Sequence, residues 1–196
     1  MNVSIVKPEE IPQFVHGMNQ AFMARANDHI PYEKTDLEEF KCRMNENSVC
    51  LGLYENTELI GGLVARTKEN SSATISHVWI STGLQNMGDG TTLLRGAEPE
   101  LRNMGYKYLY LSAANCYQPA VRLYKKLGFR PIGITANVPN TFYFLDMVKA
   151  IGPYKYPEGR RLLQLAVSCV KFRALFDKYS TPNSLHRLIY GKGKDR

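Results

Sequence analysis

The stretch Ile80-Ser-Thr-Gly-Leu-Gln-Asn-Met-Gly-Asp-Gly-Thr-Thr-Leu-Leu94 joins a strand-like run, residues 74–80, to a helix-like run, residues 91–102. The first N–H groups of a helix have no intrahelical acceptor and carry the positive end of the helix dipole. Gly88 and Gly90 lack the side chains that would hold a ligand at a distance. The stretch therefore predicts an anion-binding turn, with pyrophosphate as the favoured ligand. A glycine-softened turn before a helix is the simpler alternative.

Two common phosphate-binding loops do not fit this spelling. A P-loop requires a lysine and a hydroxyl residue after its last glycine, but Gly90 is followed by Thr91 and Thr92. The dinucleotide-binding fingerprint requires a third glycine at the position where this chain has Leu93. Both nucleotide loops are excluded, and the spacing Gln-x-x-Gly-x-Gly over residues 85–90 remains to be explained.

A second pattern lies at residues 120–129, Ala-Val-Arg-Leu-Tyr-Lys-Lys-Leu-Gly-Phe. Its alanine, two leucines and tyrosine share one face of a predicted helix, Gly128 suits the left-handed residue after a helix, and Phe129 opens a strand. Together the two patterns resemble the signatures of the GNAT superfamily of acetyl-CoA-dependent N-acetyltransferases. The first is similar to its acyl-CoA pyrophosphate loop, (Gln/Arg)-x-x-Gly-x-(Gly/Ala). The resemblance covers residues 1–150.

The order of predicted elements fits the same superfamily. We expect strands and helices in the order strand 2–6, helix 8–23, helix 35–45 with Thr35 as its N-cap, strands 49–54, 58–65 and 73–80, a loop and helix over 85–103, strand 107–112, helix 117–127, and strands 129–134 and 142–149. Such an order predicts the α/β class, with a central mixed β-sheet flanked by helices.

Composition is ordinary for a soluble globular protein, with 196 residues, 44% hydrophobic and 22% charged. The first residues lack the pattern of a signal peptide, and no apolar run approaches the roughly 20 residues that span a bilayer. We therefore expect a cytoplasmic protein without a transmembrane segment. The four cysteines form no CxxC pair and none lies near a histidine at ligand spacing, which predicts reduced thiols and no metal site: Cys42, Cys50, Cys116 and Cys169.

The basic excess belongs to the C-terminal end of the chain. Residues 151–196 hold ten basic and three acidic side chains and so account for the whole net charge of +7. We expect them to form a basic, mainly helical extension, with helices at 160–179 and 183–190, beyond a domain at 1–150. The longer helix either packs on the domain or on a second subunit of a homodimer, or it offers a basic surface to an acidic partner.

The resemblance also implies a set of acetyl-CoA contacts. In the superfamily, N–H groups of the loop hold the pyrophosphate, and the preceding strand pairs with the pantetheine arm and polarises the thioester carbonyl. The corresponding residues here are Val78, Trp79, Ile80, Gln85, Asn86, Met87, Gly88, Asp89, Gly90 and Thr91. The superfamily places an asparagine where this chain has Tyr117. Either Asn115 reaches the same place or that contact is lost.

Candidate catalytic and acceptor residues follow from the same resemblance. Tyr124 matches the tyrosine that protonates the leaving thiolate, which a phenol of pKa about 10 can do, although its position also fits simple packing. His77 stands where such enzymes often keep a base, and a single strand histidine also fits packing. The segment that borders the acceptor pocket contains Asp28, His29 and Glu33, which either select a cationic amine or belong to a surface loop.

The function that the resemblance implies is direct transfer of an acetyl group from acetyl-CoA to a primary amine of a small molecule or protein. The alternative is a non-catalytic acyl-CoA-binding module that acts through its basic extension on a macromolecule. Because similar scaffolds serve many acceptors, the fold does not identify the amine.

Overall fold

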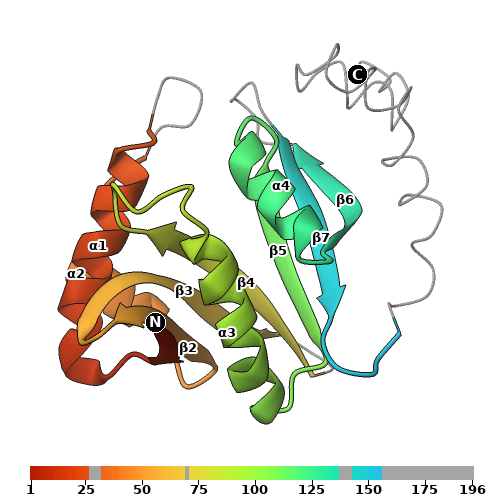
Figure 1. Cartoon of the computed structure of the whole chain (residues 1–196), viewed down its shortest axis with the longest axis horizontal. Helices are drawn as coiled ribbons and strands as arrows, with labels where there is room; N and C mark the ends of the chain where they lie inside the picture. Colours follow the sequence, from red (N-terminus) through yellow and green to blue (C-terminus); the bar gives the residue numbers. More distant parts are fainter. Residues whose placement is uncertain (27–31, 69–70, 137–142, 156–196) are drawn as a thin grey trace, which may run out of the picture. The chain divides into compact units, whose positions relative to one another are not determined.

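A computed structural model describes residues 1–26, 32–68, 71–136 and 143–155 (Figure 1). The predicted helices 160–179 and 183–190 lie outside these residues, as do Asp28 and His29. The described chain divides into two compact units. The first contains Met1–Leu111 and Ala150–Tyr154, and the second is built around Ser112–Lys149.

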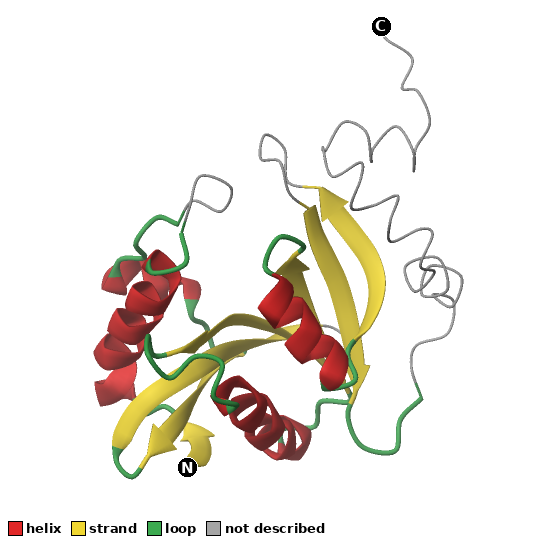
Figure 2. Ribbon diagram, turned by 45° about the horizontal axis from the view of Figure 1, so that its top comes forward, coloured by secondary structure: helices red, strands yellow, loops and turns green. Residues whose placement is uncertain are grey.

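Helices and strands follow the predicted order, and Figure 2 distinguishes them by colour. Their bounds are β1 Asn2–Ile5, the 3-10 helix η1 Pro8–Glu10, α1 Ile11–Met23, α2 Leu37–Arg43, β2 Ser48–Glu55, β3 Glu58–Lys68, β4 Ser72–Ile80, α3 Asp89–Asn103, β5 Tyr108–Ala114, α4 Gln118–Lys126, β6 Arg130–Ala136 and β7 Tyr143–Ala150. The strands form one 7-stranded sheet in the order β1-β2-β3-β4-β5-β7-β6. Strands β1 to β4 are antiparallel neighbours, whereas β4 and β5 run parallel. The α/β class with a mixed sheet flanked by helices is therefore confirmed.

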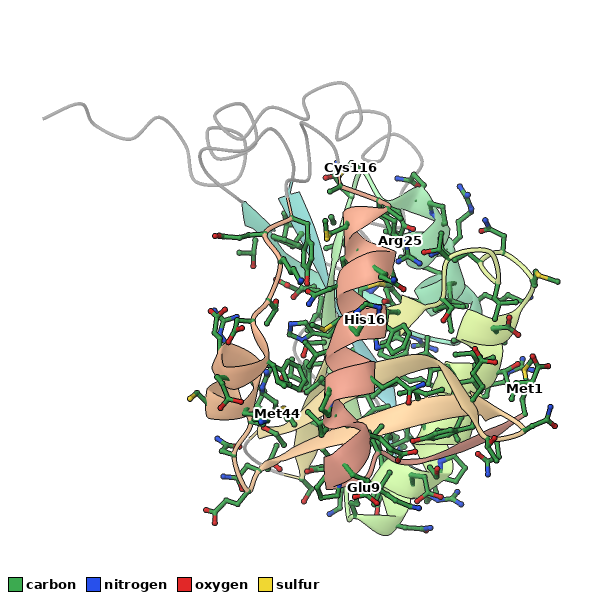
Figure 3. All side chains as sticks on the ribbon, turned by 90° about the vertical axis from the view of Figure 1, so that its left-hand side faces the viewer. Met1, Glu9, His16, Arg25, Met44 and Cys116 are labelled. Atoms are coloured by element: carbon green, nitrogen blue, oxygen red, sulfur yellow. The ribbon has the colours of Figure 1, made fainter. Side chains whose placement is uncertain are left out.

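In the first unit, helices cover both faces of the antiparallel strands. Successive residues of a strand point to opposite faces of the sheet, so the side chains of Cys50 and Leu51 of β2 lie on opposite faces. Cys50 belongs to the core under α1 and α2, where the rings of Phe14 and Trp79 meet edge to face at 5.5 Å. On the other face Val3 pairs with Leu53 and packs against α3. Figure 3 views the α1 side, with that helix crossing in front of the strands.

A close approach between α1 and the sheet depends on a glycine of α1. A Cβ built on Gly17 would lie 2.5 Å from a ring carbon of Trp79, closer than any real contact. Because Gly17 has no side chain, α1 can settle directly on the indole of β4, which is 1% exposed. The core of the unit is thus anchored on the strand that leads into the predicted anion-binding turn.

The starts of α1 and α2 differ from the predicted ones. The chain from Pro8 to Glu10 forms the 3-10 turn η1, and α1 begins only at Ile11. The N-cap of α2 is Asp36 rather than Thr35, because Asp36 Oδ1 accepts the N–H groups of Glu38 and Glu39. These bonds hold the pKa of the Asp36 carboxyl below its usual value.

In the second unit, the pattern at residues 120–129 folds into the predicted helix and glycine, but β6 begins at Arg130, one residue after the predicted Phe129. Helix α4 is followed by Gly128 with a φ of 89°, the left-handed conformation expected there. The rings of Tyr124 and Phe129 pack at 5.8 Å. A carboxylate also joins the strands, since Asp146 of β7 accepts hydrogen bonds from Ser112 of β5 and Thr135 of β6.

Among the described helices, none is long and apolar enough to cross a membrane.

Candidate functional site

A β-bulge interrupts β4 just before the predicted turn. Gly62 of β3 pairs with Trp79, and Val64 pairs with Ser76, so His77 and Val78 together face one residue of β3. His77 has a φ of 51°, a left-handed conformation that few residues other than glycine adopt, although histidine does so more often than most. Bulges re-aim side chains and occur often beside active sites.

The edge of β4 that faces β5 loses its strand partner. The parallel pairing joins residues 72–74 of β4 to residues 108–110 of β5. No further pair between these strands is seen in the described part of the chain. The last residues of β4, including Val78 and Ile80, therefore end at a sheet edge whose backbone groups are open to an extended ligand.

This edge runs directly into a turn with free backbone donors. Thr91 and Thr92 both donate their N–H groups to the Gly88 carbonyl, at 2.8 and 3.1 Å. Within the described residues, the N–H groups from Gln85 to Gly90 have no acceptor. Helix α3 begins at Asp89, earlier than the predicted helix-like run from residue 91. Free N–H groups and the positive end of a helix dipole therefore coincide, as anion binding requires.

Gly88 is required by the backbone of the turn. Its φ of 107° is a conformation strained for any residue with a side chain. A Cβ at this position would meet no protein atom within 4 Å, and the close approach of a ligand stays a prediction. Asn86, with a φ of 67°, and Met87, which is 72% exposed, form the outer part of the turn.

The Gln85 side chain fixes the turn in place. Its Nε2 donates to the carbonyl of Ile80 at 3.1 Å, and its Oε1 accepts from Nε of Arg25 at 3.4 Å. Arg25, labelled in Figure 3, follows the end of α1. Sequence reasoning missed this arginine, because it is 60 residues from Gln85 and belongs to no motif.

The predicted base, His77, is half-buried between aromatic rings of the two helices above β4. Phe22 of α1 and Phe40 of α2 each present a T-shaped contact, with ring centroids 6.4 Å from the imidazole. Nδ1 lies 3.0 Å from Ser76 Oγ. Burial lowers the pKa of His77, and the positive charges of Arg66 and Arg43 lower it further. The imidazole is therefore neutral at pH 7, the form in which it can accept a proton.

A polar network holds the segment before α2, residues 32–35, against α1. The buried side chain of Asn19 accepts a hydrogen bond from the Tyr32 hydroxyl at 2.7 Å. It also accepts from the backbone N–H of Thr35 and donates to the Thr35 carbonyl. Tyr32 also packs on Phe22, with ring centroids 5.2 Å apart. The predicted acceptor residue Glu33 is exposed beside this network, so its role in acceptor binding stays a prediction.

The remaining predicted residues belong to the second unit. Tyr124 is 8% exposed and packs on Phe129, so the packing role that its position suggested is present. Tyr117 is the N-cap residue of α4, and the Asn115 carbonyl accepts from the Gln118 side chain at 2.7 Å. Whether Tyr124 acts as an acid or Asn115 touches acetyl-CoA stays a prediction. No group of three or more His, Cys, Asp or Glu that could hold a metal ion is found in the described ranges.

Comparison with known proteins agrees with this architecture. The sequence profile of the acetyltransferase (GNAT) family matches residues 13–129. A streptothricin acetyltransferase from Escherichia coli is 27% identical over 120 residues, which are 61% of this chain and 68% of that protein.

Solved structures share the fold. The ribosomal-protein-S18-alanine N-acetyltransferase from Escherichia coli superposes with a TM-score of 0.64 at 21% identity, over 80% of this chain and 99% of that one. An aminoglycoside 6'-N-acetyltransferase complexed with coenzyme A superposes with a TM-score of 0.63 at 17% identity, over 80% of this chain and 100% of that one. The profile match spans more than half of the chain and includes the bulged strand, the turn and α4. The chain therefore belongs to the acetyltransferase (GNAT) family, a family of N-acetyltransferases.

Proposed function

We propose that this protein transfers an acetyl group directly from acetyl-CoA to a primary amine of a small molecule or protein, without a covalent enzyme intermediate. The observation that carries the proposal is the continuity between the open edge of β4 and the free N–H groups of the turn. A pantetheine arm can pair with such an edge as an added strand, while the pyrophosphate accepts the N–H groups beyond it. The residues present thus fit acetyl-CoA.

The acetyl-CoA contacts divide between backbone and side chain. Trp79 is buried in the core, so its contribution, like that of Val78 and Ile80, is through the backbone. One N–H of this run polarises the thioester carbonyl, and those from Gln85 to Gly90 bind the pyrophosphate. Because the Thr91 N–H is bonded to Gly88, its hydroxyl is the group that it offers to the ligand.

The reaction needs a neutral amine and a protonated leaving group. In the proposed mechanism His77 accepts the amine proton as nitrogen attacks the thioester carbonyl, the C–N bond forms and the C–S bond breaks. The departing thiolate takes a proton from the Tyr124 hydroxyl. The lowered pKa of His77 supports its role, because a base must be unprotonated at the working pH.

The acceptor is proposed only as an amine. The relatives' names, which include a ribosomal-protein alanine and aminoglycosides as acceptors, support an amine of either a protein or a small molecule. Selection of a cationic acceptor by Asp28, His29 and Glu33 stays a prediction. A cytoplasmic location, a homodimer and an acidic partner for residues 151–196 stay predictions too.

Two measurements on the full chain test the proposal. Acetyl-CoA should raise the melting temperature, since a ligand that binds only the native state stabilises it by about 2.7 kcal/mol at 100 times its Kd. Adding a panel of primary amines, including peptides with a free N-terminus, should then release the CoA thiol. The absence of stabilisation at millimolar acetyl-CoA would contradict the site. Stabilisation without thiol release from any amine would favour the non-catalytic binding module.

A further inference from the structure

We infer that Arg25 binds the pyrophosphate of acetyl-CoA and supplies the positive charge that the turn itself lacks. The inference rests on the proposed function and goes beyond it, because it assigns a phosphate contact to a residue outside both sequence motifs. Three observations support it: the charge of the turn, the hydrogen bonds of Gln85, and the chemistry of the guanidinium.

The turn carries no cation of its own. Residues 81–91 contain no lysine, arginine or histidine, and their one charged side chain is the acid Asp89. That carboxylate is 7% exposed at the first position of α3, where it opposes an incoming anion. Free N–H groups and a helix dipole provide only about half a unit of positive charge. A cation from another part of the chain would therefore strengthen the binding of a pyrophosphate here.

Arg25 brings a positive charge to the turn through its contact with Gln85. Its backbone N–H donates to the Phe22 carbonyl at 3.0 Å, which fixes the residue beyond the end of α1. Its Nε donates to Gln85 Oε1, and Gln85 is in turn bonded to Ile80 at the end of β4. The side chain of Gln85 thus holds the guanidinium at the turn instead of reaching for the ligand itself.

The guanidinium suits a phosphate better than any other side chain. A guanidinium presents five N–H donors in a planar fork, so it can bind a phosphate in addition to the other groups that it contacts. This fork matches the paired oxygens of a phosphate, and such charge-assisted bonds are about twice as strong as neutral ones. The competing role is structural, since a cation near a helix C-terminus also stabilises the helix dipole.

Acetyl donors of different length separate these roles. We expect Arg25→Gln to lower kcat/KM for acetyl-CoA by about 10- to 100-fold, the range for losing a hydrogen bond to a charged group. The same loss should occur with acetyl-dephospho-CoA, which keeps the pyrophosphate but lacks the 3'-phosphate. Acetyl-pantetheine, which has neither, should react at the wild-type rate within about twofold. The kcat/KM of Arg25→Lys for acetyl-CoA should lie between those of the wild type and Arg25→Gln, because an ammonium keeps the positive charge but lacks the planar set of donors.

A matched control and a folding readout complete the experiment. Arg102→Gln removes an exposed cation at the other end of α3 and should leave all three donors unaffected. Trp79 is the one tryptophan of the chain, so its fluorescence reports folding of each variant next to the site. An equal loss with acetyl-pantetheine would mean a structural role and overturn the inference. So would a loss confined to acetyl-CoA, which would point to the 3'-phosphate.

Failure of the inference differs from failure of the proposed function. If wild-type protein binds acetyl-CoA and releases thiol, but Arg25→Gln behaves like wild type with every donor, only the role of Arg25 is wrong. If wild-type protein neither binds acetyl-CoA nor releases thiol, the proposed function fails with it.

Discussion

The two motif regions use their residues in opposite ways. Between Gln85 and Gly90 the chemistry belongs to the backbone, with free N–H groups, positive φ angles and a tip side chain, Met87, that is largely exposed. In α4 and the residues after it the side chains carry the structure, with Tyr124 and Phe129 buried against each other. The first region should therefore depend on backbone conformation, and the second on side-chain volume.

The largest loss of stability is expected from shortening a buried side chain in the second region. Phe129 is 3% exposed and touches both the Tyr124 ring and the Lys149 ammonium, which lies 5.9 Å from its centroid. Phe129→Ala should lower the free energy of unfolding by about 3–5 kcal/mol, the range for removing a buried aromatic side chain. Urea melts measure this loss. Phe129→Leu, which keeps most of the apolar volume, should cost less than about 1.5 kcal/mol. Equal losses from both variants would refute dependence on volume.

A smaller effect on stability, but a larger one on ligand binding, is expected in the first region. Gly88→Val places a β-branched residue at a φ of 107°, which should cost about 1–3 kcal/mol of strain or move the turn out of shape. Acetyl-CoA affinity should fall with it, because the N–H groups lose their arrangement. Isothermal titration measures that loss.

Met87→Val is the matched control, since it places the same side chain at the exposed neighbour of Gly88. It should leave stability within about 0.5 kcal/mol and affinity close to wild type. If Met87→Val weakened binding as much as Gly88→Val, the side chains of the turn and not its backbone would bind the ligand.

The contrast also explains which features could be predicted. The α4 face, the left-handed Gly128 and the sequence of strands follow from local periodicity and glycine placement, so the sequence alone indicates them. The family resemblance of the turn is local for the same reason. The start of α3 at Asp89 and the N-cap at Asp36 each lie within about two residues of the predicted position, which is the usual uncertainty of helix ends.

Features built by distant residues had no signal in the sequence. The bulge at His77 arises from the register of β4 against β3, which no pattern within β4 reveals. Thr35 loses the N-cap position to Asp36 while its own backbone is bonded to Asn19, 16 residues earlier. The Arg25–Gln85 contact likewise exists only because α1 ends beside the turn.

His77 combines both kinds of dependence, since its backbone is left-handed and its ring is packed between Phe22 and Phe40. Its pKa is lowered in the folded protein, mainly by burial, so the unfolded chain binds the proton more tightly. The stability contribution of the neutral ring should thus be complete above the unfolded pKa of about 6.5 and be lost as pH falls through the folded pKa.

The smallest expected effect is on that pH dependence. His77→Asn, which tolerates the left-handed backbone but does not titrate, should flatten the decline of melting temperature between about pH 7.5 and 5.5. His16→Asn, on the exposed face of α1, is the matched control and should retain the wild-type slope. If the melting temperature of His77→Asn declined with pH as steeply as that of the wild type, the proton affinity of His77 would not change on unfolding. The packing of the bulge would then not be the cause of the neutral imidazole. A flattened slope accompanied by loss of acetyl transfer would tie the proton acceptor of the reaction to the same buried imidazole.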